Sequence, residues 1–413
     1  MSPTPPPRPS PHPRSVLVVG AGLAATQTVG ALRGAGFAGH VRVLGAEGVP
    51  PYDRPPLSKH LLDRSTPAWL AQEVGVDLAE LADHVDLASP ATGLTVTADG
   101  VRVRTERDEH HADVLVVASG AHAARPSAWS DAEVLHTAAD AARLRERLRP
   151  GDRLVVVGAG WVGAEVAGVA ARAGVHVEVV EAGAAPLAGA LGERVGALTV
   201  AWYDEHGIRL RTGATVAAVR PDGVTLGDGS TLRADVVLAA VGARPATGWV
   251  GDALPREPDG ALRVDEGFAV LGAPRHVRAV GDVTLRRSAR HGWVPGGHWD
   301  GALRDPATLV DDLLVPGSGA LPDRAPYVFS TQLGRDLTLF GQPARDDDVV
   351  LRGDPAAGGW TAVWYRPGAD TVTGVLTVDR PRDVGAARRL FTGPALPTLA
   401  RAVVADPDRP LRV

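Results

Sequence analysis

Lys59 is the one lysine of this 413-residue chain, in which every other member of the 43 Lys and Arg residues is arginine. It closes the segment PYDRPPLSK at residues 51–59. An ammonium group is a compact point charge whose pKa shifts readily, whereas the broader guanidinium group stays charged. The use of lysine at this position alone predicts that Lys59 does chemistry that arginine cannot do. A surface lysine without a role is the alternative.

A glycine-rich turn near the start of the chain has the pattern GxGxxA. Residues 15–20 (SVLVVG) predict a short buried strand, and a helix is expected to follow to about Gly34. The turn itself comprises Gly20, Gly22 and Ala25. Such glycines let the backbone approach a pyrophosphate, which the N–H groups and dipole of the following helix then bind. With a second strand at 41–44 and Glu47 near its end, the segment predicts a dinucleotide site.

The same pattern recurs in the middle of the chain, after a strand expected at 153–157. Its turn comprises Gly158, Gly160 and Gly163. A helix is expected from Trp161 to about Arg172, and the next strand, at 176–180, ends at Glu181. An acidic residue at this position hydrogen-bonds the ribose 2′-OH, and without an adjacent arginine for a 2′-phosphate it favours NADH over NADPH. Two independent fingerprints predict two dinucleotide sites.

Three further strands end in short polar or glycine-containing turns. The first two, at 112–120 and 234–242, suit crossings between two domains and end in Ser119, Gly120 and Gly242. The third, at 275–282, ends in Gly281 and Asp282, whose carboxylate suits a polyol, although an ordinary Gly-Asp turn is the alternative.

The predicted fold is α/β, with two Rossmann-like dinucleotide-binding domains, the second inserted in the first, and a C-terminal α+β domain. Alternating runs at 336–340 and 360–365 predict antiparallel strands in that last domain, and 386–391 and 397–404 predict helices. The expected boundaries are a disordered proline-rich lead at 1–14, a first domain at 15–118 and 243–322, a second at 119–242, and a third at 323–413, after a linker at 317–324.

Composition narrows the function. With 45% hydrophobic and 22% charged residues the chain is typical of a soluble globular protein, and a net charge of −5 argues against bulk nucleic-acid binding. No apolar stretch free of charges has membrane-spanning length, which fits a cytoplasmic location. The chain has no cysteine, which excludes a thiol nucleophile, a redox-active thiol pair and a cysteine-bound iron–sulfur cluster of its own. The thirteen histidines show no tight metal-ligand spacing, so no metal site is expected.

The combination of motifs resembles the FAD-dependent ferredoxin reductases of the putidaredoxin reductase and rhodocoxin reductase kind, within the two-dinucleotide flavoprotein superfamily. The matching segments are VVGAGLAA, PYDRPPLSK, VVASGA, VVVGAGWVGAEVA, VVLAAVGARP, RAVGD and GGHWDGAL. The resemblance covers nearly the whole chain after the lead. It implies an oxidoreductase that takes a hydride from NADH and passes electrons singly from FAD to an iron–sulfur ferredoxin serving a monooxygenase or dioxygenase.

Two other function classes remain open. One is a flavoprotein NADH oxidase or small-molecule reductase without a protein acceptor. The other is a non-catalytic nucleotide-binding regulator, which departures from the family's FAD-binding pattern motivate.

The resemblance also implies roles for individual residues. The FAD-binding residues are Gly20, Gly22 and Ala25 at the pyrophosphate, Arg54, Pro55 and Lys59 along the flavin, Asp282 at the ribityl chain, and Trp299, whose backbone reaches the pyrimidine edge of the ring. Ser119, Gly120, Gly242 and Gly281 are counted with them as cofactor-binding candidates. The NAD-binding residues are Gly158, Gly160, Gly163 and Glu181. Glu165 faces Lys59 beside flavin N5, and these two are the catalytic candidates. Trp161 covers the flavin until nicotinamide displaces it, or else serves inter-domain packing.

Four positions depart from the family's pattern. Ala46 stands where an acidic residue usually binds the FAD ribose, and the adjacent Glu47 either replaces that residue or points to solvent. His136, kept as a cofactor-binding candidate, stands where the family has an arginine that contacts FAD. Gly297 replaces a glutamate, and Phe329 replaces a tryptophan in the third domain.

The implied ferredoxin is an acidic partner, so a basic surface near the flavin is expected to receive it. Arg286, Arg287 and Arg290 follow Gly281-Asp282 and are the predicted docking residues. A solvated loop is the alternative.

Overall fold

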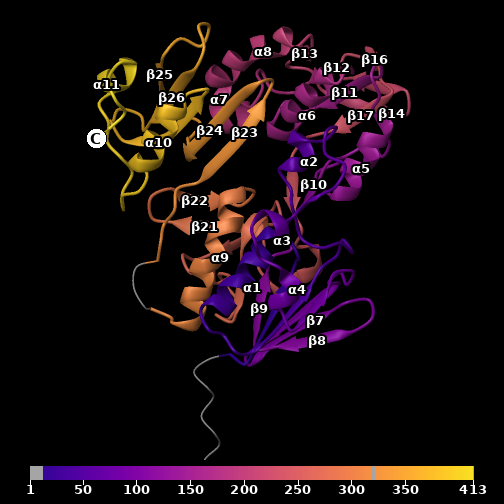
Figure 1. Cartoon of the computed structure of the whole chain (residues 1–413), viewed down its shortest axis with the longest axis vertical. Helices are drawn as coiled ribbons and strands as arrows, with labels where there is room; N and C mark the ends of the chain where they lie inside the picture. Colours follow the sequence, from indigo (N-terminus) through magenta and orange to yellow (C-terminus); the bar gives the residue numbers. More distant parts are fainter. Residues whose placement is uncertain (1–12, 318–320, 413) are drawn as a thin grey trace, which may run out of the picture.

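The computed structural model describes residues 13–317 and 321–412, which fold into three packed parts (Figure 1). In the view of Figure 1 the first part lies at the bottom, the second at the upper right and the third at the upper left. The lead predicted at 1–14 falls almost wholly outside the described residues, as do residues 318–320 of the predicted linker.

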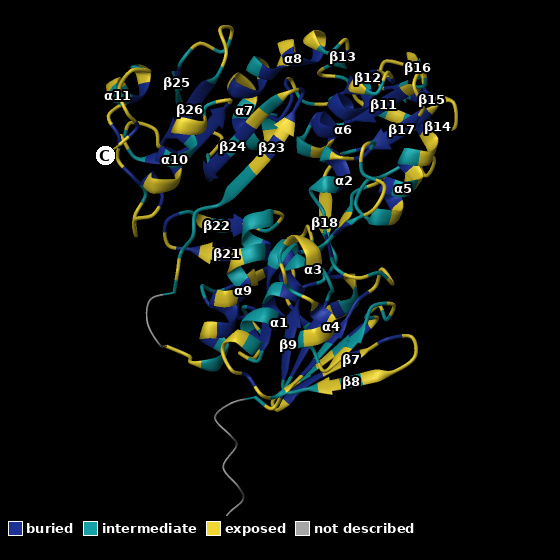
Figure 2. Ribbon diagram, viewed as in Figure 1, coloured by how far each residue is buried: buried dark blue, intermediate teal, exposed yellow. Residues whose placement is uncertain are grey.

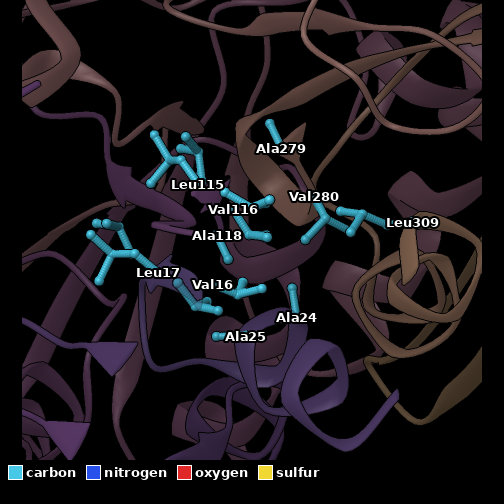
Figure 3. Packing of buried hydrophobic residues seen from close by; sticks show 14 of the residues in the cluster. Val16, Leu17, Ala24, Ala25, Leu115, Val116, Ala118, Ala279, Val280 and Leu309 are labelled. Carbon is cyan, nitrogen blue, oxygen red and sulfur yellow. The ribbon is translucent and has the colours of Figure 1, made fainter. Parts of the chain in front are cut away.

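The first part is built on a five-stranded parallel sheet. In spatial order its strands are β20 (Val277–Ala279), β9 (Val114–Val117), β1 (Ser15–Val19), β2 (His40–Leu44) and β5 (His84–Asp86). Parallel strands covered on both faces are continuous apolar runs, as the segment VLVV of β1 is. Helices α1 (Leu23–Gly34) and α9 (Trp299–Leu314) pack beside each other, and Figure 3 shows Val16, Ala24 and Leu309 together in the buried cluster that joins them to the sheet.

The second part repeats this design on a four-stranded parallel sheet. Its strands, in spatial order, are β13 (Arg209–Arg211), β12 (His176–Val180), β11 (Arg153–Val157) and β17 (Val236–Ala239). Helix α6 (Trp161–Arg172) follows the glycine turn, and α5 (Ala138–Arg147) precedes β11. A capping box between Thr137 and Asp140 fixes the start of α5, because each side chain accepts a hydrogen bond from the backbone N–H of the other residue.

Two short antiparallel strands, β10 (Ala121–Ala123) and β18 (Ala243–Pro245), carry the chain between these parts. The Ser119 hydroxyl donates a hydrogen bond to the Ala246 carbonyl at 2.8 Å and ties the two crossings together. Strands from both sides of the second part therefore complete the first sheet, and the predicted α/β class with an inserted dinucleotide unit is confirmed. The chosen domain boundaries stay a prediction.

The third part is an antiparallel sheet with two helices. Its strands, in spatial order, are β23 (Tyr327–Gln332), β24 (Arg335–Gly341), β27 (Val372–Val378), β26 (Trp360–Tyr365) and β25 (Asp348–Arg352). The helix predicted at 386–391 is α10 (Pro381–Leu390), which begins earlier, at a proline suited to a first helical turn. The helix predicted at 397–404 is wrong in its first half: α11 is Arg401–Ala405, because Thr398 pairs with Thr371 as a β-bridge.

Smaller elements decorate this frame. They include two three-stranded antiparallel sheets. One consists of β6 (Gly93–Thr97), β7 (Gly100–Arg104) and β8 (Glu109–Ala112), and the other of β14 (Val216–Arg220), β15 (Gly223–Leu226) and β16 (Thr231–Arg233). Figure 2 shows the central strands buried, whereas β7 alternates between buried and exposed residues and β8 between exposed and intermediate ones. In the part of the chain that the structure describes, no helix combines the length and the apolar character needed to cross a membrane.

Candidate cofactor and active site

A cavity of about 750 Å³ lies where the three parts meet. Its wall includes residues of the first glycine turn, the segment PYDRPPLSK, the start of α6, the crossing strands, the start of α9 and the beginning of β23. A volume of this size suits a small-molecule or cofactor site. The predicted site residues on its wall are Gly20, Gly22, Glu47, Arg54, Pro55, Lys59, Ser119, Gly120, His136, Gly160, Trp161, Glu165, Gly242, Gly281, Asp282 and Trp299. Ala25, Gly158, Gly163 and Glu181 lie outside this wall.

The first glycine turn follows the carboxyl end of β1 and lines the cavity. Gly20 has φ of +120°, and a Cβ there would lie 2.0 Å from the Ala118 carbonyl oxygen, so only glycine fits. Gly22 precedes α1, whose first turn (LAAT) is uncharged, and this leaves the helix N–H groups and dipole to an anionic ligand. Ala25 is fully buried in the core below the turn, where its small side chain lets α1 approach the sheet. The residues present therefore fit a pyrophosphate group.

The second glycine turn has the same construction. At Gly158, with φ of +105°, a Cβ would lie 2.4 Å from the Ala240 carbonyl oxygen, and at Gly163 it would lie 2.0 Å from that of Gly158. Gly160 precedes α6 and lines the cavity that the first turn also lines. The Glu181 carboxylate accepts hydrogen bonds from the backbone N–H groups of Ala159 and Gly183, both at 2.7 Å. Glu181 thus lies at the turn, although outside the cavity wall.

Lys59 and Glu165 form an ion pair on the cavity wall. Lys59 ends the short helix α2 (Pro56–Lys59), and its Nζ lies 2.5 Å from Glu165 Oε1 on α6. The side chains are 17% and 4% exposed, so the pair is shielded from bulk water. A buried carboxylate is stable only when its oxygens are bonded, and the Ser58 and Ser330 hydroxyls also donate to it. Lys59 Nζ also lies 5.2 Å from the ring centroid of Phe329.

Glu47 belongs to a second polar cluster on the wall of the cavity. Its carboxylate is 2.5 Å from Arg54 Nη2 and accepts a hydrogen bond of 2.5 Å from the Tyr52 hydroxyl. Arg54 also donates to the His136 carbonyl at 2.5 Å. The Glu47 carboxylate does not simply point to solvent, because Arg54 and Tyr52 hold it. Its contact with an FAD ribose stays a prediction.

His136 presents a half-buried imidazole to this cluster. Its Nε2 has no hydrogen-bond partner among the described residues. Burial, and then the nearby Arg54 charge, lower the pKa of His136, so the ring is neutral near pH 7. The orphaned nitrogen on the wall of the cavity is consistent with a site that a ligand completes.

Three residues that bond groups of this site were given no role from the sequence: Ser58, Ser330 and Asp53. Ser58 and Ser330 reach Glu165, and Asp53 Oδ1 accepts a hydrogen bond of 2.7 Å from the indole Nε1 of Trp299, whose ring meets Phe329 edge-on at 5.8 Å. Ser58 is adjacent to Lys59 in PYDRPPLSK, which was the available signal. Ser330 could have been found only by knowing that β23 packs on α6.

The predicted basic docking surface is wrong. Arg286 and Arg290 are 6% and 7% exposed, and both are bonded to Asp323. Arg287 is on the surface, but its guanidinium is bonded to Glu266 at 2.7 Å. The segment is not a loop but the hairpin β21 (Thr284–Ser288) and β22 (Gly292–Pro295), which binds the chain leading to the third part.

The fold and the two glycine turns are those of the pyridine nucleotide-disulphide oxidoreductase family, and the chain belongs to this family. The family matches residues 14–301, and residues 327–413 match the reductase C-terminal domain. Among curated proteins it is similar to the anthranilate 1,2-dioxygenase system ferredoxin--NAD(+) reductase component of Burkholderia cepacia, with 32% identity over 92% of this chain and 95% of that one. The resemblance stated from the sequence is confirmed.

Solved structures agree. The crystal structure of Fdr9 shares 36% identity and a TM-score of 0.87 over 96% of this chain and 99% of that one. The covalent putidaredoxin reductase–putidaredoxin complex shares 26% identity and a TM-score of 0.84 over 92% and 93%. Because this chain has no cysteine, the disulphide chemistry in the family's name is not carried by its own residues.

Proposed function

We propose that this protein is an NADH-dependent FAD reductase that supplies electrons to an iron–sulfur ferredoxin of an oxygenase system. The observation that carries the proposal is the single cavity that unites the first glycine turn, the start of the second dinucleotide helix and the Lys59–Glu165 pair. Its relatives among curated proteins include ferredoxin reductase components of dioxygenase systems, which supports the same assignment. We also propose a cytoplasmic location and the domain boundaries given above.

FAD, when bound, would accept a hydride from NADH and release electrons one at a time to a one-electron acceptor. The turn at Gly20 and Gly22 would hold its pyrophosphate through the N–H groups at the start of α1. Asp282, Trp299 and the crossing residues Ser119 and Gly120 form the wall that would surround its remaining length. In the second part, the turn at 158–163 and Glu181 would hold NADH. The negative charge of Glu181 would repel the 2′-phosphate of NADPH.

Lys59 provides a fixed positive charge on the wall of the same cavity. Negative charge that develops beside a preorganised ammonium is stabilised more than in water, because no solvent has to reorganise. Glu165 holds the ammonium in place, and the Phe329 ring is a further contact, 5.2 Å from Nζ to the ring centroid. The longer, planar guanidinium of arginine would not fit the same position. This accounts for the one lysine of the chain.

Phe329 supports a position for the protein partner. It is 36% exposed at the edge of the cavity, on β23 of the third part. Exposed aromatic side chains are typical anchors of protein interfaces. With Arg286 and Arg290 buried, we propose the surface around Phe329 as the ferredoxin docking site.

Anaerobic NADH titration of the purified protein, with and without ferredoxin, tests the function. The protein should be yellow, NADH should bleach it, and cytochrome c reduction should require added ferredoxin. A colourless protein, or one that NADH does not bleach, would support the non-catalytic regulator. Rapid turnover with oxygen alone would support the NADH oxidase.

A further inference from the structure

Ser330 brings the third part of the chain into direct contact with the ion pair. It lies on β23, is 3% exposed, and its hydroxyl donates to Glu165 Oε1 at 2.5 Å across 165 residues of sequence. Glu165 lies on α6 of the second part, while Lys59 lies on α2, in the segment of chain between strands β2 and β5 of the first part. One buried carboxylate therefore holds together groups from all three parts.

The orientation of the Ser330 hydroxyl is set by its neighbour on the same face of the strand. Residues two apart on a strand point the same way, so Ser330 and Gln332 both face α6. Gln332, 1% exposed, donates from Nε2 to Ser330 Oγ at 3.1 Å. A hydroxyl has one proton and two acceptor positions. The glutamine occupies an acceptor position, and the proton is directed to Glu165.

Ser330 and Lys59 share one carboxylate oxygen. Both bond Glu165 Oε1, while the Ser58 hydroxyl bonds Oε2. With a hydroxyl on each oxygen, Ser330 on Oε1 and Ser58 on Oε2, the carboxylate plane is fixed independently of the ammonium, whose position is then fixed by the carboxylate. Removal of the Ser330 hydroxyl leaves Oε1 with Lys59 as its one remaining partner among these three. The carboxylate then keeps one hydroxyl instead of two, and its plane is held less firmly.

We infer that Ser330 is a positioning residue for flavin reduction, acting through Glu165 on Lys59, so that the C-terminal domain completes the hydride-transfer site as well as offering a docking surface. This inference rests on the proposed function. It predicts that a change in the C-terminal domain alters the reaction with NADH even when no ferredoxin is present.

The test compares Ser330→Ala with the matched control Thr331→Val. Thr331 is the next residue of β23, faces the opposite way, and donates its hydroxyl to Asp336 outside the cavity. Three quantities are measured on each holoprotein: FAD content, the midpoint potential of the bound flavin, and anaerobic reduction by NADH in stopped flow without ferredoxin. The last measurement separates the limiting rate from the Kd for NADH.

In Ser330→Ala the limiting rate should fall about tenfold, the scale of one hydrogen bond to a charged group, with the Kd for NADH unchanged. The midpoint potential should become more negative, because a less firmly held ammonium stabilises the reduced flavin less. Thr331→Val should match the wild type in all three quantities. Ser330→Thr, which keeps the hydroxyl, should recover most of the rate.

A wild-type rate and potential in Ser330→Ala would overturn the inference while leaving the proposed function intact. Failure of NADH to reduce the wild-type flavin would instead overturn the proposed function. If Ser330→Ala binds less FAD than the wild type, Ser330→Cys decides, because it keeps the volume but donates weakly. A lowered limiting rate in that variant supports the inference, and a wild-type rate overturns it.

Discussion

Lys59 and Glu165 are 106 residues apart in the sequence, yet Lys59 Nζ lies 2.5 Å from Glu165 Oε1. The ammonium of Lys59 lies at the end of α2, and the carboxylate of Glu165 lies on α6 of the second part. An ion pair with a 4% exposed carboxylate is costly to break on one side only, because the remaining charge stays buried. The pair therefore ties the α2 segment to α6 at the cavity.

Replacement of Lys59 should slow flavin reduction. Lys59→Met removes the ammonium, so the limiting rate of anaerobic reduction by NADH should fall about 10²–10³-fold. Lys59→Arg keeps a positive charge in a group of the wrong shape, so the same rate should fall by a smaller factor. The control is Arg64→Met, which removes a cation from a surface pair with Glu73 near α2. A near-normal reduction rate in Lys59→Met would contradict the role.

Glu181 should determine the preference for NADH. Ala159 and Gly183 donate their N–H groups to different oxygens of Glu181, so Glu181→Gln removes the negative charge and keeps an acceptor for one of the two bonds, whereas Glu181→Ala loses both. The ratio of kcat/KM for NADPH to that for NADH should rise about tenfold, the scale of one removed charge repulsion. Equal kcat/KM for the two cofactors in the wild type would show that Glu181 does not discriminate.

Phe329 should anchor the ferredoxin. Phe329→Ala should raise the KM for ferredoxin about tenfold or more, as the loss of an aromatic anchor does at other interfaces. Because Phe329 also lies near Lys59, the rate of anaerobic flavin reduction by NADH is measured separately for each variant. Any change in that rate is then subtracted from the effect on ferredoxin-dependent turnover. Val315→Ala, at the far end of α9 and 56% exposed, serves as the control. An unchanged ferredoxin KM in Phe329→Ala would place the docking surface elsewhere.

His291 should make stability depend on pH. Burial, and then the Arg290 charge, lower the pKa of His291 to about 4 from its ordinary 6.5. Between these two values the unfolded chain binds a proton that the folded chain does not, so stability falls as the pH is lowered through this window. From pH 7.5 to pH 5 the loss from this group should be about 1–2 kcal/mol, allowing for its partial exposure.

The measurement is the free energy of unfolding in denaturant at both pH values. His291→Gln cannot take up the proton and should lose less stability on acidification than the wild type does. His122→Gln, which changes an exposed histidine, should keep the wild-type dependence. The same pH dependence in His291→Gln and the wild type would exclude His291 as the source.

The frame of the protein was predictable from its sequence, because its signals are local. A run such as SVLVV followed by GAG fixes a buried strand, a turn that needs glycine and a helix start within a dozen or so residues. The predicted strands near 15–20 and 153–157 and both glycine turns are accordingly found where expected.

The errors lie where the partner of a side chain is distant in sequence. Arg286 and Arg290 follow a turn and look exposed, but Asp323 lies 33 or more residues downstream and pairs with both. Ser330 reaches Glu165 only because β23 packs on α6. Glu47 is a different case, because its partners Arg54 and Tyr52 lie within seven residues of it, and its contact with an FAD ribose stays a prediction.

The single lysine has a practical consequence for anyone who handles this protein. Amine-directed reagents for surface coupling, biotinylation or mass-spectrometric cross-linking find one side-chain amine in the whole chain, and it is the ammonium on the cavity wall. Acylation there would neutralise the charge that Glu165 holds. Such reagents would modify the wall of the cavity, and immobilisation or labelling is better directed to an introduced cysteine, which would have no competing native thiol.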